Sequence, residues 1–381
     1  MYLPEELVVE ILDKASAASL ARLRCVSKRW KALIKDVRLA EKRSHATMIM
    51  LIDFKVYLTS VNLHQIDNNM VKVIDQFSLK DPRSKSSKEV KILDILHCDG
   101  LLLCTTKDLR LVVWNPYSRE TKWIQPRISY KRLDNFALGK TSCNKYKILR
   151  MEQFGELVSP YLLESEIYDF TSNSWRDLSE TRDWHIPPWM RRIMYVNGNT
   201  YWLACSNKDN VVFLQSFDFS TERFRSVSLP GDHHSYTIFS LSVTREEQKL
   251  CLLTQQKFQN RSPYINIWIA TKIESHGAAS WIKFLSIALA SIHQPFCVCT
   301  TMSFLVDPGN KVLVCRGKNG VSNNFLNILG ENKSIQVDHH DAKSLCKLLV
   351  NYVPSFGSNP TRGSLKKRLK STVASSDYTI M

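Results

Sequence analysis

Two short patterns in this sequence could do chemistry, and the first imitates a phosphate-binding loop. Gly139-Lys140-Thr141 matches the end of such a loop, in which backbone N–H groups and a lysine hold phosphate oxygens. The loop also requires a glycine five residues before Gly139, where this chain has Asp134. The flanking residues predict strands, whereas a helix should follow such a loop. The sequence therefore argues against phosphate binding by these residues.

The second pattern consists of cysteine and histidine clusters, because both side chains bind metal ions. Zinc sites use cysteine pairs separated by two residues, but Cys297 and Cys299 are separated by one. On a strand the two thiols would point to one face, so we expect them to be buried as small apolar side chains. Asp232-His233-His234 and Asp338-His339-His340-Asp341 are runs of adjacent residues, which rarely converge on one ion. We expect no metal site and no cofactor.

No catalytic constellation accompanies these patterns. The sequence contains no Gly-x-Ser-x-Gly elbow, no His-Glu-x-x-His pair and no dinucleotide-binding fingerprint. Nothing pairs a nucleophile with a base, so we expect no catalytic residues. A non-catalytic binding protein is the favoured class.

The charge of the chain is high but widely distributed. The 381 residues carry 52 Lys+Arg and 36 Asp+Glu, a formal net charge of +16. Residues 1–48 and residues 361–381 each have a surplus of +4, and the remaining +8 is spread over the rest. No segment carries a dense basic stripe with interleaved aromatic residues. The charge by itself therefore identifies no nucleic-acid or other acidic partner.

The sequence favours a reducing compartment. The first residues are acidic where a signal peptide would be positive, and the longest apolar stretch, near residues 284–292, is too short to span a bilayer. Ten cysteines in that context predict free thiols. We expect a cytoplasmic and/or nuclear protein that does not associate with membranes. The basic run 365–370 leaves nuclear import and a simple solvated tail both open.

The N-terminal forty residues predict three short helices. Pro4 suits a first helical position, and Leu3, Leu7 and Ile11 recur every four residues to give one apolar stripe. Two further helices follow, the last carrying Trp30. Helices this short cannot bury all their apolar side chains among themselves. Some of that surface must therefore pack on the remainder of the chain or on a partner.

Beyond residue 48 the pattern changes to short apolar runs separated by turn signals. The runs are rich in Val, Ile, Tyr, Trp and Phe, which is typical of strands. Examples are residues 101–105, 111–114, 146–149, 211–213, 249–253, 266–270 and 311–315.

These runs repeat with a period near 50. The repeated unit is a strand, an Asn or Asp, a polar turn and an aromatic residue. Its anchor positions are 115, 169, 218 and 270, which are 54, 49 and 52 residues apart. The unit at 270 is a looser version. Asn62 and Gly330 extend the series. Such a period predicts a β-propeller, in which the Asn or Asp satisfies the turn and the aromatic packs between blades. A two-sheet sandwich with chance spacing is the alternative.

The spelling of the N-terminal segment resembles the F-box. The resemblance covers residues 3 to about 42, although the loop 14–18 lacks the proline usual in the family. It implies docking onto the Skp-type adaptor of an SCF (Skp–cullin–F-box) ubiquitin ligase. The adaptor-binding residues that it implies are Leu3, Pro4, Leu7, Val8, Ile11, Leu12, Leu20, Leu23, Val26, Trp30 and Leu33.

The remaining chain is similar to the plant F-box-associated domain of the kelch-like type. Phrases in the order of that family include Trp114-Asn115-Pro116, residues 136–139, residues 196–204 and Tyr352-Val353-Pro354. Residues 183–189 and the pair His233-His234 are particular to this chain, which leaves ligand selectivity and simple drift both open. The resemblance implies a substrate receptor whose substrate-binding residues are unknown.

We therefore expect an α+β multidomain protein. An F-box at 1–45 precedes a mostly-β domain at 49–355, a kelch-like propeller of about six irregular blades, and a disordered basic tail at 356–381. The expected function is substrate recognition in an SCF-type ubiquitin ligase, with an adaptor, a cullin and an unknown protein substrate as partners. The alternatives are a basic nucleic-acid-binding protein and a free-standing interaction protein with a degenerate F-box. An enzyme built on the propeller lacks any candidate constellation.

Overall fold

The structure is a computed structural model. It describes residues 45–62, 71–82, 89–116, 118–154, 162–178, 183–232, 235–245, 248–256, 264–292, 302–316, 325–331, 333–338 and 346–352, together with Pro4, Leu7 and Val8. Most of the predicted F-box, the predicted tail at 356–381, Cys297, Cys299, His233 and His234 lie outside these residues.

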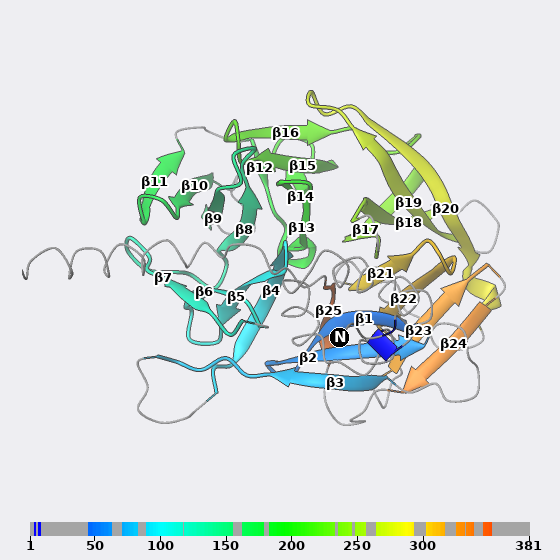
Figure 1. The fold of residues 1–381 in the computed structure, drawn as a ribbon. Coiled ribbons are helices and arrows are strands. Elements are labelled where there is room, and N and C mark those ends of the chain that lie inside the picture. Colours follow the sequence, from blue (N-terminus) through cyan, green and yellow to red (C-terminus); the bar gives the residue numbers. More distant parts are fainter. Residues whose placement is uncertain are drawn as a thin grey trace, which may run out of the picture.

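The described strands form six antiparallel sheets arranged in a ring (Figure 1). Four sheets follow the chain in simple order. They are β4 (Ile92–Cys98), β5 (Leu101–Thr106), β6 (Leu111–Trp114) and β7 (Thr121–Ile124); β8 (Asn135–Lys140), β9 (Tyr146–Phe154), β10 (Leu162–Asp169) and β11 (Ser174–Leu178); β17 (Tyr236–Val243), β18 (Leu250–Gln256), β19 (Tyr264–Ile273) and β20 (Ala279–Ala288); and β21 (Phe304–Asp307), β22 (Val312–Arg316), β23 (Phe325–Gly330) and β24 (Lys333–Asp338).

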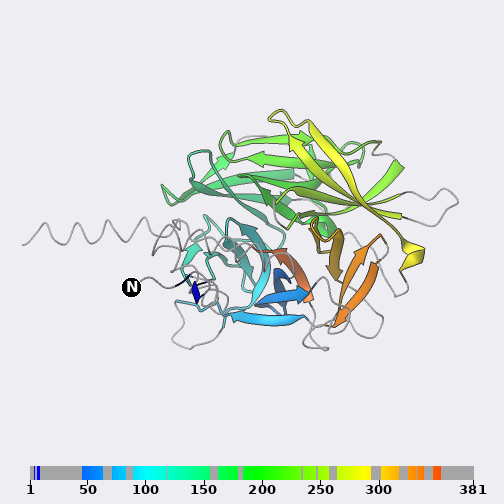
Figure 2. The same cartoon turned by 45° about the vertical axis from the view of Figure 1, so that its right-hand side comes forward.

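The other two sheets depart from this order. One contains five strands, β12 (Trp184–His185), β13 (Ile193–Val196), β14 (Asn199–Ser206), β15 (Val212–Asp218) and β16 (Arg223–Val227), with the short 3-10 helix η1 (Pro188–Met190) before β13. The last joins both ends of the domain: β25 (Cys346–Asn351) pairs with β1 (His45–Ile52), followed by β2 (Lys55–Asn62) and β3 (Lys72–Phe77). This pairing closes the ring, as Figure 2 shows from a second angle.

The apolar side chains pack between sheets. The buried apolar residues form six clusters, each filled mainly by two neighbouring sheets. In β1, Met48 and Met50 face the β21–β24 sheet, whereas Ile49 and Leu51 face the β4–β7 sheet. Successive side chains of a strand point to opposite faces. A strand with sheets on both sides must therefore be apolar at every position, which explains the continuous apolar runs in the sequence.

The predicted repeat corresponds to the blades. Asn115 follows β6, Asp169 ends β10 and Asp218 ends β15, and each of these is the third strand of its sheet from the centre. Each side chain caps its turn: the Oδ1 atoms accept hydrogen bonds from backbone N–H groups two or three residues on, at 3.2, 2.6 and 2.8 Å respectively. The predicted strands and the propeller are confirmed, and the two-sheet sandwich is wrong because the described strands make six sheets.

The aromatic residue that follows each anchor packs toward the preceding blade. Trp123, Trp175, Phe224 and Trp281 each join the cluster that their sheet shares with the sheet before it. The indole Nε1 of Trp175 donates to the carbonyl oxygen of Gln125 at 2.8 Å, and that of Trp281 donates to Ser228 at 2.8 Å. Gln125 and Ser228 each follow the outermost strand of the preceding sheet. These two hydrogen bonds join neighbouring blades in the same way.

A glycine permits close contact at another seam, meaning the boundary between two neighbouring sheets. Gly139 of β8 lies against the ring of Phe219, which follows β15 in the next sheet, and a Cβ atom at Gly139 would lie 2.1 Å from that ring. Only the absence of a side chain allows Phe219 to be fully buried here. The glycine of the phosphate-loop-like pattern is therefore explained by packing between blades.

Candidate functional site

A cavity of about 490 Å³ lies at the centre of the ring. Most of its lining comes from β4, β8, β13, β17 and β21, the innermost strands of five sheets, with further residues from β5 and Arg316 from β22. The 3-10 helix η1 adds Pro188 and Trp189, both exposed, and the exposed Arg132 precedes β8. These three residues mark the side on which the cavity meets solvent. Pro188 and Trp189 belong to the segment 183–189 that the sequence marks as particular to this chain.

The charges that line the cavity are mostly positive. Four arginines contribute to the lining, against two carboxylates, which gives a surplus of 4 − 2 = +2. The arginines are Arg132, Arg191, Arg192 and Arg316, and the carboxylates are Asp94 and Asp134. A concave site lined by one sign of charge attracts ligands of the opposite sign.

The guanidinium group of Arg191 makes only one hydrogen bond within the described structure. Its Nη1 atom donates to the carbonyl oxygen of Arg132 at a long 3.5 Å. Its Nε and Nη2 atoms are inaccessible to solvent and have no hydrogen-bond partner among the described residues. Burial lowers the pKa of Arg191, although the carboxylates of Asp134 and Asp94 oppose that effect.

Arg192 is the more extreme case. Its Nε atom is buried and finds no partner in the described part of the chain. Burial lowers the pKa of Arg192 to about 10, and the charge of Asp94 only partly offsets that cost. A buried N–H that lacks an acceptor loses its hydration without compensation, so these atoms are poised to donate to a ligand.

One acceptor in the cavity is also unsatisfied. The Oδ2 atom of Asp134 accepts from the backbone N–H of Lys131 at 2.8 Å and from Arg150 Nε at 2.9 Å. Its Oδ1 atom is buried without a hydrogen-bond partner in the described structure. Burial raises the pKa of Asp134, although these hydrogen bonds act in the opposite direction. The cavity thus presents unpaired donors and an unpaired acceptor.

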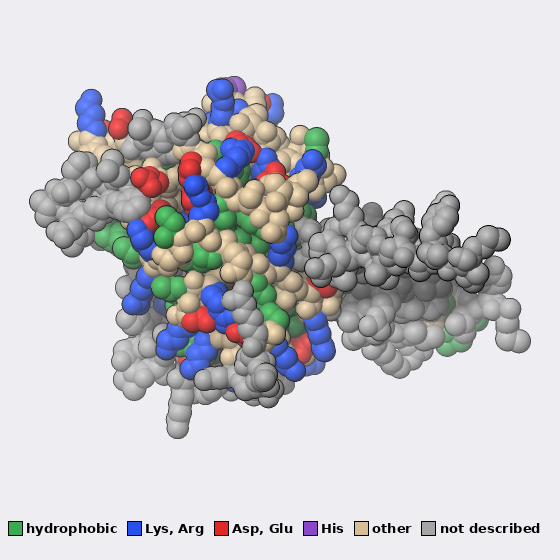
Figure 3. All heavy atoms as spheres, turned by 90° about the vertical axis from the view of Figure 1, so that its left-hand side faces the viewer, with side chains coloured by type: hydrophobic (Ala, Val, Ile, Leu, Met, Phe, Trp, Pro, Cys, Tyr) green, Lys and Arg blue, Asp and Glu red, His purple; other side chains and the backbone are tan. Residues whose placement is uncertain are grey.

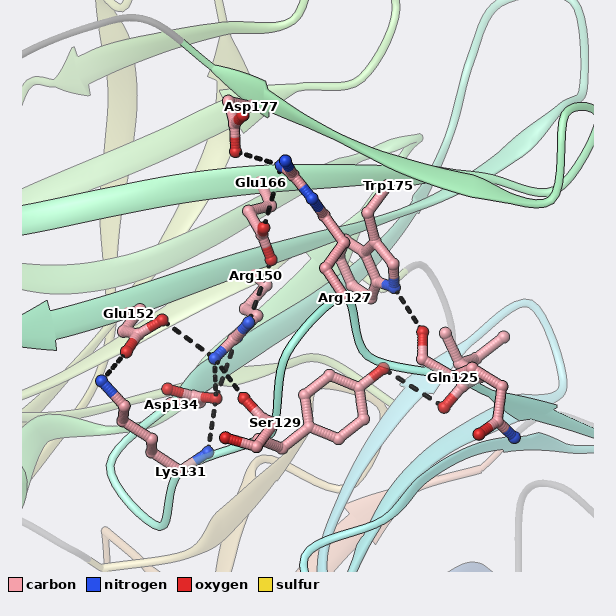
Figure 4. A network of polar contacts seen from close by, with 12 residues as sticks. Gln125, Arg127, Ser129, Lys131, Asp134, Arg150, Glu152, Glu166, Trp175 and Asp177 are labelled. Carbon is pink, nitrogen blue, oxygen red and sulfur yellow. Dashed lines mark hydrogen bonds and ion pairs between the residues drawn. The ribbon is translucent and has the colours of Figure 1, made fainter.

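Beside the cavity lies an arginine that is fully paired (Figure 4). Arg150 of β9 binds Asp134 at 2.9 Å, Glu152 at 2.9 Å and Glu166 at 3.0 Å, and it donates to the carbonyl oxygen of Ser129 at 2.9 Å. Its side chain is only 4% exposed. This network fastens the connection between β7 and β8, which carries residues 125–134, onto the β8–β11 sheet.

Asp99 connects the far ends of three innermost strands. It lies in the turn after β4, and its Oδ2 atom accepts from Lys140 Nζ at 3.3 Å and from the hydroxyls of Tyr146 and Tyr195 at 3.4 and 3.1 Å. Lys140 ends β8 and Tyr195 lies in β13. Lys140 therefore forms an ion pair between blades. The chain continues from Lys140 through a turn into β9, without the helix that a phosphate-binding loop needs.

The described residues show no other arrangement that suggests chemistry. No three His, Cys, Asp or Glu side chains among them come together as a metal ion would require. No helix in the described part of the chain is long and apolar enough to cross a membrane. On the face shown in Figure 3, basic and acidic side chains are interspersed, so that face offers no continuous basic surface to a nucleic acid.

Three of the predicted adaptor-binding residues lie within the described structure. The backbone N–H of Val8 donates to the carbonyl oxygen of Pro4 at 3.1 Å, the bond expected in a helix that starts near Pro4. Leu7 is 47% exposed, whereas Val8 is buried. The other predicted residues, Leu3, Ile11, Leu12, Leu20, Leu23, Val26, Trp30 and Leu33, lie outside the described residues, and the three-helix arrangement stays a prediction.

Comparison with known proteins defines the class first. Residues 2–42 match the F-box domain model, and residues 47–358 match the model of the F-box associated beta propeller domain. The chain is thus a six-bladed β-propeller preceded by an F-box.

The particular family follows from the extent of these matches and from relatives in Arabidopsis thaliana. A protein named "Putative F-box protein" is 56% identical over 362 residues, covering 93% of this chain and 97% of the relative. An F-box/kelch-repeat protein is 36% identical over 379 residues, covering 93% of this chain and 94% of the relative. This chain belongs to the family of F-box proteins with an F-box-associated β-propeller domain.

The cavity residues were not predicted from the sequence. Arg191 and Arg192 follow a mostly apolar stretch, residues 184–190, just before a strand, and Asp134 was considered only because a phosphate-binding loop would have a glycine there. The available signal was positional: both segments immediately precede an innermost strand, where a propeller places its central residues.

Proposed function

We propose that this protein is the substrate-recognition subunit of an SCF-type ubiquitin ligase. In this proposal the F-box binds a Skp-type adaptor and, through it, a cullin, while the propeller holds a protein substrate. The observation that carries the proposal is the F-box match at residues 2–42 directly before a closed propeller.

The mechanism is proximity. A receptor that binds substrate and ligase together raises the effective concentration of a substrate lysine near ubiquitin carried by another subunit. No side chain of the receptor needs to make or break a bond. This is consistent with a described structure in which the polar clusters join blades or line a cavity.

The proposed place of action is the cytoplasm, the nucleus or both. Cys98, Cys104, Cys143, Cys205, Cys251 and Cys315 are free thiols in the described structure. Burial raises the pKa of Cys104 and Cys251, which keeps both thiols protonated and unreactive. Unpaired thiols suit a reducing compartment.

The adaptor-binding surface is tested by co-expression of the full chain with a plant Skp-type adaptor. We expect wild type to form a one-to-one complex on size exclusion, and the double variant Leu7→Asp with Trp30→Ala to form none. Ile282→Asp is the matched control, because Ile282 on β20 is 49% exposed, close to the exposure of Leu7, and belongs to the propeller. That variant should keep the complex.

Circular dichroism of each variant establishes whether the propeller remains folded. A complex that survives in the double variant would contradict the assigned surface. Absence of a complex for wild type would leave a free-standing interaction protein. If a truncated chain is used, it should begin at residue 44, because β1 starts at His45 and the boundary predicted at residue 49 falls within that strand.

A further inference from the structure

We infer that the central cavity binds a peptide segment that carries a carboxylate. Arg191 and Arg192 would donate hydrogen bonds to the carboxylate, and Asp134 would accept one from a neighbouring N–H of the peptide. The inference rests on the proposed function, since such a peptide would belong to the protein substrate. It adds the place of binding and the chemistry that is recognised.

The unpaired donors point to a missing anion. Arg191 Nε, Arg191 Nη2 and Arg192 Nε are all buried without partners in the described structure. Buried polar groups in folded proteins almost always have a partner, because an unsatisfied one carries the full cost of its lost hydration. Two such guanidinium groups, adjacent in sequence and lining the same cavity, define a site for an acceptor with a negative charge.

The unpaired acceptor selects a peptide over a simple anion. Asp134 Oδ1 is buried without a partner and lines the same cavity. A carboxylate next to a bound phosphate would repel its second negative charge, whereas it can accept a hydrogen bond from an amide N–H. A peptide with an acidic side chain supplies both groups, and a planar carboxylate matches the fork of an arginine.

The size and rim of the cavity agree with this ligand. A volume of about 490 Å³ lies within the range of small-ligand cavities and admits a short segment, not a folded domain. Trp189, on the solvent side, is 49% exposed. Tryptophan and arginine are enriched among residues that dominate binding energy. Trp189 is placed to contact an apolar side chain next to the acidic one.

The test is a selection of displayed random heptapeptides against the full-length chain, with the Arg192→Gln chain selected in parallel. We expect Asp and Glu to be enriched at one position with wild type, and this enrichment to disappear with Arg192→Gln. Selection of no peptide, of peptides without an acidic position, or of the same acidic peptides by both chains would overturn the inference.

The best selected peptide is then measured by fluorescence anisotropy. We expect Arg192→Gln to weaken binding about tenfold or more, which corresponds to one charge-assisted hydrogen bond. Arg192→Lys should fall between the two, because it keeps the charge but loses the Nε donor. Arg223→Gln is the control: it removes the same charge from an exposed position on β16, outside the cavity lining, and should bind as wild type does.

Inorganic phosphate and citrate serve as competitors that separate the ligand classes. If either ion binds tightly, if that binding depends on Arg192, and if no peptide binds, the ligand of the cavity is a small anion and the peptide assignment is wrong. Adaptor binding by the same proteins distinguishes the two proposals: a wild-type chain that binds the peptide but no adaptor refutes the ligase role and leaves the cavity assignment standing. A chain that binds the adaptor but no acidic peptide refutes the cavity assignment and leaves the ligase role standing.

Discussion

Buried arginine nitrogen atoms are paired at the seams between blades but unpaired in the central cavity. At the seam beside β8, Arg150 is surrounded by Asp134, Glu152 and Glu166, and all of its nitrogen atoms have partners. In the cavity, the Nε atom of Arg192 is also removed from water, yet it has no partner among the described residues. Asp134 belongs to both places: Oδ2 is saturated by the seam, and Oδ1 is left for the cavity.

The difference separates structural from functional polar groups. A buried charge that is fully paired is retained because removing one member leaves the others uncompensated. A buried charge without partners costs stability, so folding does not explain its presence. Binding of a ligand does. The seam should therefore be sensitive to mutation, and the cavity should not.

The largest expected effect is at the seam. Arg150→Ala leaves three carboxylates without their common partner, and we expect a loss of about 3–5 kcal/mol in the free energy of unfolding, measured by urea titration. Arg127→Ala is the control: its side chain is 44% exposed and pairs with Asp177 at 2.5 Å, so a much smaller loss is expected. Equal losses for the two variants would refute the contrast.

A second effect tests apolar packing at the next seam. Gly139→Ala forces the ring of Phe219 to move, and we expect a loss of about 1–3 kcal/mol. The same substitution in a Phe219→Leu background should cost less, because the ring that it meets is gone. Thermal and urea unfolding of the four proteins complete a double-mutant cycle. An additive result would show that Phe219 is not the obstacle.

A third effect is the pH dependence of a pair between blades. Glu222 pairs with Lys147 at 2.5 Å and with Arg176. Burial acts to raise the pKa of Glu222, but these partners hold that pKa below its ordinary value. A carboxyl whose pKa is lower in the folded state stabilises above its unfolded pKa and loses that contribution as the pH falls through the folded pKa.

We therefore expect Glu222→Gln to be about 1 kcal/mol less stable than wild type near neutral pH, with the gap closing as the pH falls below about 4. Urea unfolding at several pH values measures the gap. Glu164→Gln, at an exposed position on β10, is the control for loss of a glutamate outside this pair. A constant gap would mean that Glu222 acts through packing and not through its charge.

The smallest effect on stability is expected in the cavity. Arg192→Gln removes a guanidinium whose buried Nε has no hydrogen-bond partner in the described structure, so the variant should unfold within about 0.5 kcal/mol of wild type or be more stable. A loss comparable to that of Arg150→Ala would show that Arg192 holds the fold together. In that case the contrast between seam and cavity would collapse.

Much of the fold could be read from the sequence because its signals are local. Asn115, Asp169 and Asp218 cap turns through their own side chains, and an aromatic residue follows each of them six or eight residues later. The runs at 101–105 and 111–114 are apolar at nearly every position because both faces of each strand are covered. Periodicity, turn chemistry and strand composition thus gave the number and order of blades.

The candidate site could not be read in the same way. Trp184, Ile186 and Trp189 set the stretch before Arg191 and Arg192 apart from a solvated loop, but nothing in it shows whether the two arginines have partners. Arg150, which is fully paired, is the same residue type. Whether an arginine has partners depends in part on distant residues, such as Asp134 and Glu166, each 16 positions from Arg150. Only the pairing of β8, β9 and β10, and the packing of the 125–134 connection on that sheet, bring those residues together.

The sequence by itself determined the F-box segment, the strand-rich repeat and the absence of a recognisable catalytic motif, because each depends on residues close together in the chain. The tertiary structure decided the rest. Pairing of β25 with β1 joins residues about 300 positions apart, as in Val350 opposite Ile49, and creates the central cavity. Burial in that cavity is what turns Arg192 from a surface charge into an unsatisfied donor, since the cost of an unpaired charge depends on how far water is excluded.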